Sequence, residues 1–211
     1  SSNDVCAVII EGIQGVGGLN APSPEFLSFL SVQCKTNDAL LILDEIQSGY
    51  GRTGKFFAHQ HAPIEADIVT MAKGMGNGFP IAALLIHPKI KAKSGMLGTT
   101  FGGSYLACAA ALSVLDIITS EKLIDNATFI GAEITNSLKS LTAIKSIKGK
   151  GLMMGIEFDF PIKAIRAELL EKHHIFTGSS SNPNLLRILP PLSITKEEIN
   201  PFITALKSIL K

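Results

Sequence analysis

The sequence lacks tryptophan, has only three cysteines and carries little charge of either sign, and each shortage excludes a class of protein. Its 19 basic and 18 acidic residues nearly cancel, and no stretch gathers enough Lys or Arg to indicate a nucleic-acid or membrane surface. Cys6, Cys34 and Cys108 form no Cys-x-x-Cys pair and cannot all be joined in disulfides. A reducing, cytoplasmic setting is therefore the simplest interpretation.

Long apolar runs and leader sequences are absent as well. The most apolar stretch, 106–115, is too short to cross a bilayer, and Asp116 interrupts its continuation. Ser1 to Asp4 come directly before a strand-like run, without an initiator methionine or a signal peptide. We therefore expect no membrane segment, and we expect the sequence to begin inside a longer protein.

What is present is enough apolar material for a large core, since 46% of the 211 residues are hydrophobic. A helical pattern opens at Pro24, and short aliphatic runs predict strands at 5–10, 39–43, 68–71 and 81–86. Two strands joined by a helix form a βαβ unit, which predicts an α/β fold with a mostly parallel sheet. The first strand should be buried on both faces.

The second half of the sequence predicts a different arrangement. Strands are expected in "IKSIKGKGLMMGIEF" and near 185–189, and helices are expected at 105–118, 121–141, 162–173 and 195–210. Thr195 and Glu198 form a capping-box pattern at the start of the last helix. We place one boundary, with residues 1–125 in a mostly parallel domain and residues 126–211 in a smaller α+β domain.

Two charged residues stand where predicted parallel strands end. Asp44 closes the second strand, and Lys73 follows the third, directly before the glycine-rich "GMGNG". Open α/β sheets bind ligands at the carboxyl ends of their strands. For either residue alone, a helix cap, a salt bridge or a surface position is the more ordinary explanation. The pair is harder to explain in that way.

A lysine at the end of a buried strand is costly as an ammonium. In a low-dielectric pocket its amine loses its proton readily and becomes a nucleophile for carbonyl carbon, and the carbonyl of pyridoxal phosphate is the common biological case. That chemistry also needs an acidic group against the pyridine nitrogen, for which Asp44 is the candidate. We therefore interpret Lys73 as a buried imine former.

Two further motifs suit anions. Thr99 and Thr100 precede the alanine-rich helix, where they suit either a bound phosphate or a turn that caps the helix. Arg187 lies in an apolar strand before a Pro-Pro turn and needs an anionic partner, which is either a bound carboxylate or a structural glutamate. Both alternatives stay open for each motif.

Other patterns predict no site. His59 and His61 have no cysteine or carboxylate cluster beside them, so we expect solvent-facing histidines and no metal; His173 and His174 are likewise expected at the surface. The glycines of "GVGGLN" and "GMGNG" open no helix in the dinucleotide pattern.

Taken in order, four stretches resemble the class III (subgroup II, fold type I) PLP-dependent aminotransferases, and within them acetylornithine aminotransferase. The stretches are "LILDEIQSGYGRTGKFFAHQH", "DIVTMAKGMGNGFPIAA", "GTTFGGSYLACAAALSVLDII" and "LLRILPPLSIT". The likeness runs from about Val5 to Ile194. It implies a fold type I α/β chain that holds the carboxyl-terminal part of the large domain plus the small domain.

The resemblance also implies a cofactor site for pyridoxal 5'-phosphate. Lys73 would hold the cofactor as an imine and later act as the base, while Asp44 would pair with the pyridine nitrogen. Gln47 would reach the phenolic oxygen of the cofactor, with Glu45 and Ile46 beside it.

For the substrate, the resemblance implies Arg187 as the carboxylate-binding residue, with Glu11 and Thr99 nearby. Thr100 would bind the cofactor phosphate. In this family the threonines serve the active site of the partner subunit, so a homodimer is expected.

The sequence departs from the family pattern at several places. Val16 stands where ornithine and 4-aminobutyrate aminotransferases have a glutamate that can cover the substrate-binding arginine, so Arg187 should be permanently available. Ser104-Tyr105 replaces Asn-Pro and Leu97 replaces His, which are tolerable loop changes.

The phosphate cup, the ring-stacking aromatic residue and the second arginine of the family's amino-terminal half have no counterpart here. We expect that half to be cleaved, disordered or supplied as another chain, and this half alone to be inactive.

The leading hypothesis is transfer of the distal amine of N-acetylornithine to 2-oxoglutarate, in arginine biosynthesis. The same chemistry on N-succinylornithine, ornithine, 4-aminobutyrate or a diamine is the neighbouring alternative. A non-catalytic partner chain on this fold and a dinucleotide-binding domain are alternatives from other classes, and the missing fingerprint helix counts against the second.

Overall fold

The aliphatic runs of the first half form a four-stranded sheet in the computed structural model of the chain, which describes residues 4–211. Its strands, in spatial order, are β1 (Ala7–Glu11), β2 (Leu40–Asp44), β3 (Ile68–Met71) and β4 (Ala83–Ile86). The first three are parallel and β4 is antiparallel to β3. The mostly parallel sheet is therefore confirmed, while Ser1 to Asn3, where the sequence was expected to begin inside a longer protein, lie outside the described residues.

The predicted βαβ unit is also confirmed. Helix α1 (Pro24–Thr36) connects β1 to β2, and it begins where Ser23 accepts a hydrogen bond from the backbone N–H of Phe26. Pro24 occupies the first turn, where its missing N–H costs nothing.

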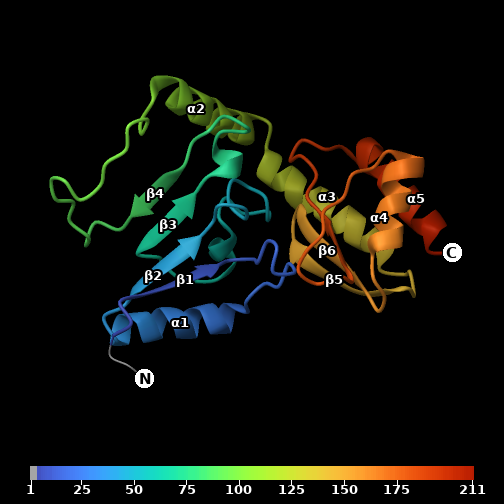
Figure 1. Cartoon of the computed structure of the whole chain (residues 1–211), viewed down its shortest axis with the longest axis horizontal. Helices are drawn as coiled ribbons and strands as arrows, with labels where there is room; N and C mark the ends of the chain where they lie inside the picture. Colours follow the sequence, from blue (N-terminus) through green and yellow to red (C-terminus); the bar gives the residue numbers. More distant parts are fainter. Residues whose placement is uncertain (1–3) are drawn as a thin grey trace.

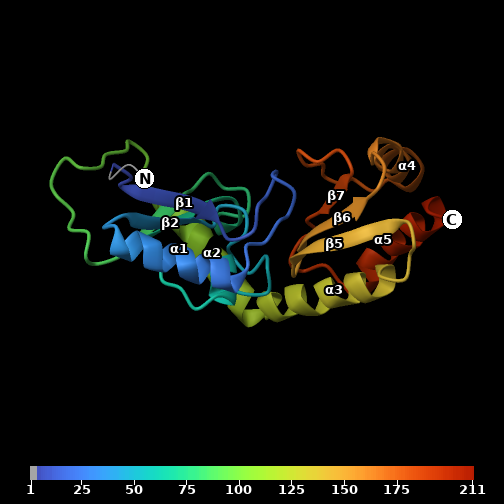
Figure 2. The ribbon, with the colours of Figure 1, turned by 90° about the horizontal axis from the view of Figure 1, so that it is seen from below.

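Helices cover only one face of this sheet. Alternation along the strands places Leu43 and Val69 on the same face, where they belong to the clusters that pack against α1 and α2 (Tyr105–Ser120). Figure 2 shows both helices below the sheet. On the other face Ile9, Leu84 and Ile86 are 62%, 48% and 41% exposed. The expectation that the first strand is buried on both faces is therefore wrong, because nothing in residues 4–211 covers this second face.

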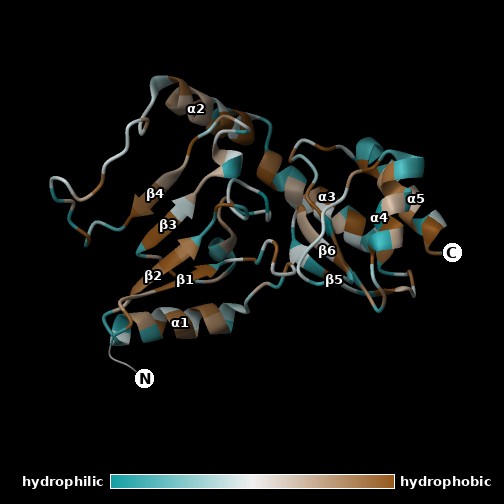
Figure 3. Cartoon of the chain, viewed as in Figure 1, coloured by the Kyte–Doolittle hydropathy of each residue, from teal (hydrophilic) through white to brown (hydrophobic). Residues whose placement is uncertain are grey.

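The second half forms an antiparallel sheet in the order β5 (Ile144–Lys150), β6 (Met153–Phe158), β7 (Leu185–Ile188). Its core is completed by α3 (Leu123–Leu138), α4 (Lys163–His173) and α5 (Lys196–Ile209), and α3 and α5 lie on the same side of the sheet (Figure 2). The capping box is confirmed, since Thr195 and Glu198 exchange side-chain to backbone bonds at 3.2 and 2.8 Å. The apolar residues of both sheets are visible in Figure 3.

We call β1–β4 with α1 and α2 the first lobe, and β5–β7 with α3, α4 and α5 the second lobe. Helix α3 runs from the first lobe along the second (Figure 2). The expected boundary after residue 125 falls inside α3, and the division into domains stays a prediction. None of the helices within residues 4–211 is long and apolar enough to span a membrane.

Candidate active site

The carboxyl ends of the three parallel strands carry the polar side chains of the site. Glu11 pairs with Asp44 and Asp44 with Thr70 in the strand register, and Lys73 follows three residues after Thr70. Figure 1 shows this edge of the sheet turned toward the second lobe. The structure therefore brings Asp44 and Lys73 to one edge, as the sequence predicts, and places Glu11 there as well.

Asp44 is held by two neighbours through one of its oxygens. Its Oδ1 accepts hydrogen bonds from the backbone N–H of Ile46 at 2.9 Å and from the hydroxyl of Thr70 at 3.2 Å. Both bonds are made to Oδ1, which leaves Oδ2 for a further donor. Asp44 lies on the uncovered face of the sheet because it is in register with Thr70 and Leu84, the latter 48% exposed.

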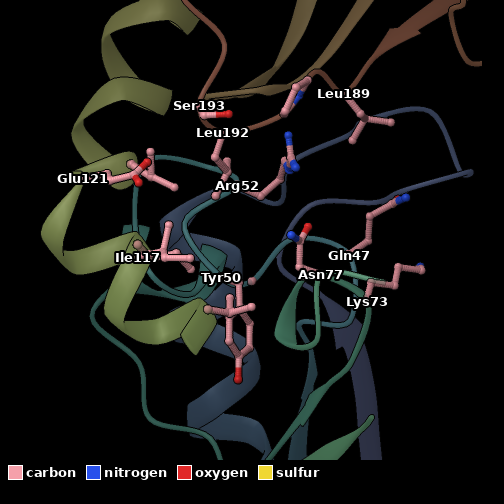
Figure 4. Close-up of a pocket in the computed structure, with 16 residues that line it drawn as sticks. Gln47, Tyr50, Arg52, Lys73, Asn77, Ile117, Glu121, Leu189, Leu192 and Ser193 are labelled. Carbon is pink, nitrogen blue, oxygen red and sulfur yellow. The ribbon is translucent and has the colours of Figure 1, made fainter. Parts of the chain in front are cut away.

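Lys73 has an unusual backbone for a lysine. Its φ of +42° lies in the left-handed region, which costs a non-glycine residue about 1–2 kcal/mol, and such strain gathers at functional sites. Lys73 is not among the lysines that form ion pairs in residues 4–211. Figure 4 shows its side chain running alongside Gln47, away from Ile117 and Glu121.

The expectation that Lys73 is buried is wrong for this chain, since its side chain is exposed. The residue stands at the rim of the sheet face that no part of residues 4–211 covers. Strand position alone predicts where a side chain lies, and burial depends in addition on the layers that pack above it.

Gln47 and Glu11 form one side of this edge. Oε2 of Glu11 accepts the backbone N–H of Gly15 at 2.8 Å. A Cβ at Gly15 would lie 1.9 Å from Oε1 of Gln47, so a larger residue there would displace the end of that side chain. Glu11 and Gln47 thus lie on either side of Gly15, and the roles that the family resemblance implies for them stay a prediction.

Glu45, although adjacent to Asp44, points into the protein. It is 1% exposed and accepts bonds from the Ser48 hydroxyl at 2.6 Å and the backbone N–H groups of Ala58 and His59 at 2.9 and 2.8 Å. Burial raises the pKa of Glu45, but the bonds from His59, Ser48 and the backbone outweigh it and hold the pKa below 4.5. Its carboxylate fixes the loop after β2 and is fully engaged, so a contact with a cofactor would have to use its backbone.

The histidines divide into two kinds. His59 Nδ1 contacts Oε1 of Glu45 at 2.9 Å, and His61 Nε2 contacts the carbonyl of Thr53 at 3.1 Å. The expectation that these two are solvent-facing is therefore wrong, because each closes a contact inside the loop after β2. His173 and His174 are exposed, as predicted. No group of three or more metal-ligating side chains occurs in the part of the chain that the structure describes.

The structure does not bring Thr99 and Thr100 to Lys73. Both threonines are exposed, and the segment 87–104 extends away from the carboxyl edge of the sheet (Figure 1). Helix α2 begins at Tyr105 with Ser104 as its N-cap residue and without a side-chain cap bond, so the alternative in which the threonines cap this helix is not observed.

Arg187 lies half-buried on β7 with two nitrogens lacking partners. Its Nε and Nη1 are buried and have no hydrogen-bond acceptor among the residues described. Gly178 pairs with it through two backbone bonds of 2.9 and 3.1 Å, and no glutamate reaches the guanidinium. The structural ion pair left open by the sequence is therefore not formed.

Arg187 and Lys73 line different cavities. The cavity of Arg187, of about 440 Å³, lies within the second lobe. That of Lys73, of about 460 Å³, lies between the lobes. The two cavities share lining residues, because Leu189 and Pro191, which follow Arg187 in the sequence, line both of them.

Sequence reasoning found Gln47 and Lys73 and missed the other residues of the Lys73 cavity, among them the polar side chains of Tyr50, Arg52 and Asn77 (Figure 4). Of these three residues, only Arg52 could have been noticed in the sequence, since a single arginine stands there in the glycine-rich "GYGRTG".

The model of the family described as "Aminotransferase class-III" matches residues 1–210. The chain belongs to the class-III aminotransferases. It is 43% identical over 213 residues to the acetylornithine aminotransferase of Bacillus subtilis, a match that covers 98% of this chain and 54% of the relative. The acetylornithine aminotransferase of Aquifex aeolicus is 42% identical, with 98% and 54% covered. This class-III aminotransferase chain thus spans about half the length of the curated relatives it matches.

Solved structures give the same family and fold. The ornithine aminotransferase of Toxoplasma gondii superposes with a TM-score of 0.91 at 33% identity, covering 99% of this chain and 52% of that one. The acetylornithine aminotransferase of Elizabethkingia anophelis gives 0.87 at 32% identity, with 97% and 53% covered. The fold type I expectation is confirmed.

Class-III aminotransferases depend on pyridoxal phosphate. The residues of this chain fit that cofactor: an exposed amine on a strained backbone at Lys73, and at Asp44 a carboxylate with one oxygen held in place and the other available.

Proposed function

We propose that this chain is half of a PLP-dependent aminotransferase that transfers the distal amine of N-acetylornithine to 2-oxoglutarate, in the cytoplasm and in arginine biosynthesis. The observation that carries the proposal is the placement of Lys73 and Asp44 at one open sheet edge, in a chain 43% identical to a Bacillus subtilis acetylornithine aminotransferase. We call "complete protein" this chain together with the polypeptide that supplies the other half of a class-III aminotransferase.

Bound pyridoxal phosphate supplies a ring that withdraws electrons from the carbon bearing the donor's amine. Lys73 would hold the cofactor through Nζ, and once the donor's amine has taken its place the released amine would accept the proton of that carbon. Asp44 would hold the ring nitrogen, since Ile46 and Thr70 fix its Oδ1 and leave Oδ2 available. Gln47 would donate to the phenolic oxygen.

Arg187 binds a substrate carboxylate, since Nε and Nη1 are buried without an acceptor among the described residues and a guanidinium suits a carboxylate. Val16 supplies no carboxylate that competes for it, and the Val16 carbonyl is instead bonded to the backbone N–H of Ser181 at 2.9 Å. N-succinylornithine, ornithine, 4-aminobutyrate and a diamine are the alternative donors.

The remaining contacts come from outside this chain. The bare sheet face at Ile9, Leu84 and Ile86 is covered by the other half of the protein. Thr99 and Thr100 serve the active site of a second subunit in a homodimer, which agrees with their exposure and with the direction of the 87–104 segment.

The test is an absorbance spectrum of the complete protein before and after borohydride, followed by peptide mapping. A band typical of a lysine-bound pyridoxal phosphate should become fixed on the Lys73 peptide. Lys73→Ala should remove the band and lower kcat/KM by about 10⁴-fold or more. Lys163→Ala, at an exposed lysine on α4, should change neither.

Comparing N-acetylornithine, N-succinylornithine, ornithine and 4-aminobutyrate, each with 2-oxoglutarate, then identifies the donor by its kcat/KM. Absence of the band with added pyridoxal phosphate would contradict the proposal. It would favour the alternative of a non-catalytic partner chain on the same fold.

A further inference from the structure

Helix α1 is apolar on two opposite faces. Its inner face, with Leu27 and Cys34 buried, packs against the first sheet. On its outer face Phe26, Phe29 and Val32 are 47%, 60% and 58% exposed. Residues three apart are neighbours on a helix, so these side chains form one strip along its surface, which we call the α1 strip. A surface helix normally turns a polar face outward, so the strip indicates a surface that another element covers.

Completion of the first lobe would leave the strip uncovered. Helix α1 lies at the outer margin of this lobe, away from the second lobe (Figure 1, Figure 3). The bare face of the sheet, where Ile9 is exposed, lies on the side opposite α1. An α/β domain is a sheet between two layers of helices, so elements that cover Ile9 add the second layer and leave the outer side of α1 free. A partner for the strip must therefore come from outside this domain.

The two ends of α1 carry opposite charges. Glu25 stands in its first turn and Lys35 in its last turn, and both are exposed. Neither residue belongs to the ion pairs formed within residues 4–211. Leu30 is midway between them and Phe29 is the middle residue of the strip, so the charges and the strip have nearly the same centre. Helix α1 therefore presents an acidic end, an apolar middle and a basic end.

This order fits a second copy of α1 in one direction only. A two-fold axis across the helix makes the two copies antiparallel, which overlaps the strips and brings Glu25 next to the partner's Lys35. A parallel pair would instead set like charges side by side at both ends. Antiparallel packing also opposes the two helix dipoles. Because exposed ion pairs contribute little energy, the strip supplies the affinity and the charges set the direction.

We propose that the α1 strip is a self-association surface, through which two copies of the complete protein pair with their α1 helices antiparallel. The contact is separate from the homodimer proposed above, because the 87–104 segment extends from another side of the first lobe (Figure 1). Pairing through α1 therefore joins homodimers into larger assemblies. One helix pair is small beside the about 1,600 Å² of a standard interface, so the association is weak and depends on concentration.

The test is sedimentation equilibrium of the complete protein from about 1 μM to about 0.5 mM. The average mass of the unaltered protein should rise reversibly with concentration. Phe29→Gln together with Val32→Gln should raise the dissociation constant at least tenfold, because the strip loses its two most exposed side chains. Glutamine is favoured in helices over both residues, so the thermal unfolding midpoint should not fall. Leu170→Gln, which removes an exposed apolar side chain from α4, should leave the association unchanged.

Charge exchange at low ionic strength tests the direction of the pair. Glu25→Lys and Lys35→Glu each set like charges together at both ends of the contact, so each should raise the dissociation constant about three- to tenfold. The protein with both substitutions regains opposite pairs and should associate within about twofold of the unaltered protein. Both changes oppose the helix dipole, so the unfolding midpoint is measured alongside to separate loss of α1 from loss of the contact.

A mass that stays constant over the whole range would overturn the proposal, and so would association that persists in the Phe29→Gln, Val32→Gln protein. A lower unfolding midpoint in that protein, without a change in mass, would show that the other half covers the strip and would overturn it as well. Absence of rescue by the charge exchange would refute the antiparallel pair. Mass is measured without turnover, so a protein that lacks the lysine-bound absorbance band, and thus refutes the aminotransferase, still tests this surface.

Discussion

At the scale of single residues, the neighbouring carboxylates of Asp44 and Glu45 point in opposite directions and differ in how fully they are hydrogen-bonded. Strand alternation turns Asp44 to the uncovered sheet face, with one oxygen fixed by Ile46 and Thr70. Glu45, the next residue, turns inward and accepts bonds from Ser48 and from the backbone of the 58–59 segment. One carboxylate keeps an oxygen available at the open face, while its neighbour fixes the loop that begins directly after β2.

Glu45→Gln should destabilise the protein by about 2 kcal/mol, because the amide loses the charge that strengthens these hydrogen bonds and presents donors to N–H groups. The pKa of Glu45 is lower folded than its ordinary 4.5. Its stabilising contribution is therefore fully present above pH 4.5 and is lost as the pH falls through the lower folded value. Urea unfolding midpoints between pH 3 and 7 measure both effects.

Glu65→Gln removes the same charge at an exposed position and serves as the control. It should leave the midpoint nearly unchanged across that range. A Glu45→Gln protein whose acid dependence matches the unaltered one would contradict the role given to Glu45.

At the scale of elements, α3 approaches the β5–β6 turn closely enough to need a glycine. A Cβ at Gly131 would lie 2.3 Å from the carbonyl oxygen of Gly151, which is backbone and cannot rotate away. The helix and the turn are thus in direct contact, next to the loop that carries Arg52.

Gly131→Ala should therefore lower stability by about 1–3 kcal/mol, although alanine is favoured over glycine inside a helix by about 1 kcal/mol. Asn136→Ala, exposed on the same helix, gains a smaller helix preference without a clash and loses only the exposed bond from Lys139, so it should be neutral or slightly stabilising. The thermal unfolding midpoints of both variants show whether the helix preference of alanine or the clash with Gly151 has the larger effect at position 131. A stabilised Gly131→Ala protein would show that α3 can move off the turn.

At the scale of the whole molecule, the two lobes differ in how completely they are covered. The second lobe has a continuous core in which Leu169, Leu186 and Leu206 are fully buried. The first lobe has one packed face, and on the other Ile9 and Leu84 remain about half exposed or more.

An apolar dye should therefore bind to this chain alone, and binding should fall sharply in the complete protein, because exposed apolar patches of this kind mark surfaces that another element covers. Ile9→Asn together with Leu84→Asn should reduce the dye fluorescence of the isolated chain. Phe129→Asn, which removes an exposed aromatic residue from α3, should leave most of it. Equal fluorescence from the chain alone and from the complete protein would show that the face stays uncovered.

Sequence reasoning succeeded where the signal is local. Strand Ile68–Met71 and the capping box at Thr195 depend on residues within a few positions of one another, and both were predicted correctly. The shared edge of Asp44 and Lys73 followed from topology, because parallel strands end on the same side.

The remainder depends on contacts between distant parts of the chain. The bond from His59 to Glu45 joins residues 14 apart, and that from Arg52 to Pro190 joins residues 138 apart. The hydrophobic periodicity of helices and strands does not indicate such long-range pairs. Burial of Lys73 requires a layer packed over this end of the sheet, and no part of residues 4–211 supplies one. Its strand position therefore predicts its place in the sheet and not its burial.

The segment 190–194 is held from outside at three carbonyl oxygens, by Arg52 at Pro190 and by Asn126 at Leu192 and Ile194. This arrangement has a consequence for how freely the sequence of the segment can change. Every residue has a carbonyl oxygen, so the bonds to positions 190, 192 and 194 do not depend on which side chains stand there. Substitutions at the segment's exposed position Ser193 can accumulate while its path is kept, as long as the donors on the other side persist, whereas Leu192 and Ile194 also pack against the core. Selection on the segment's shape therefore acts on Arg52 and Asn126, two residues well outside it.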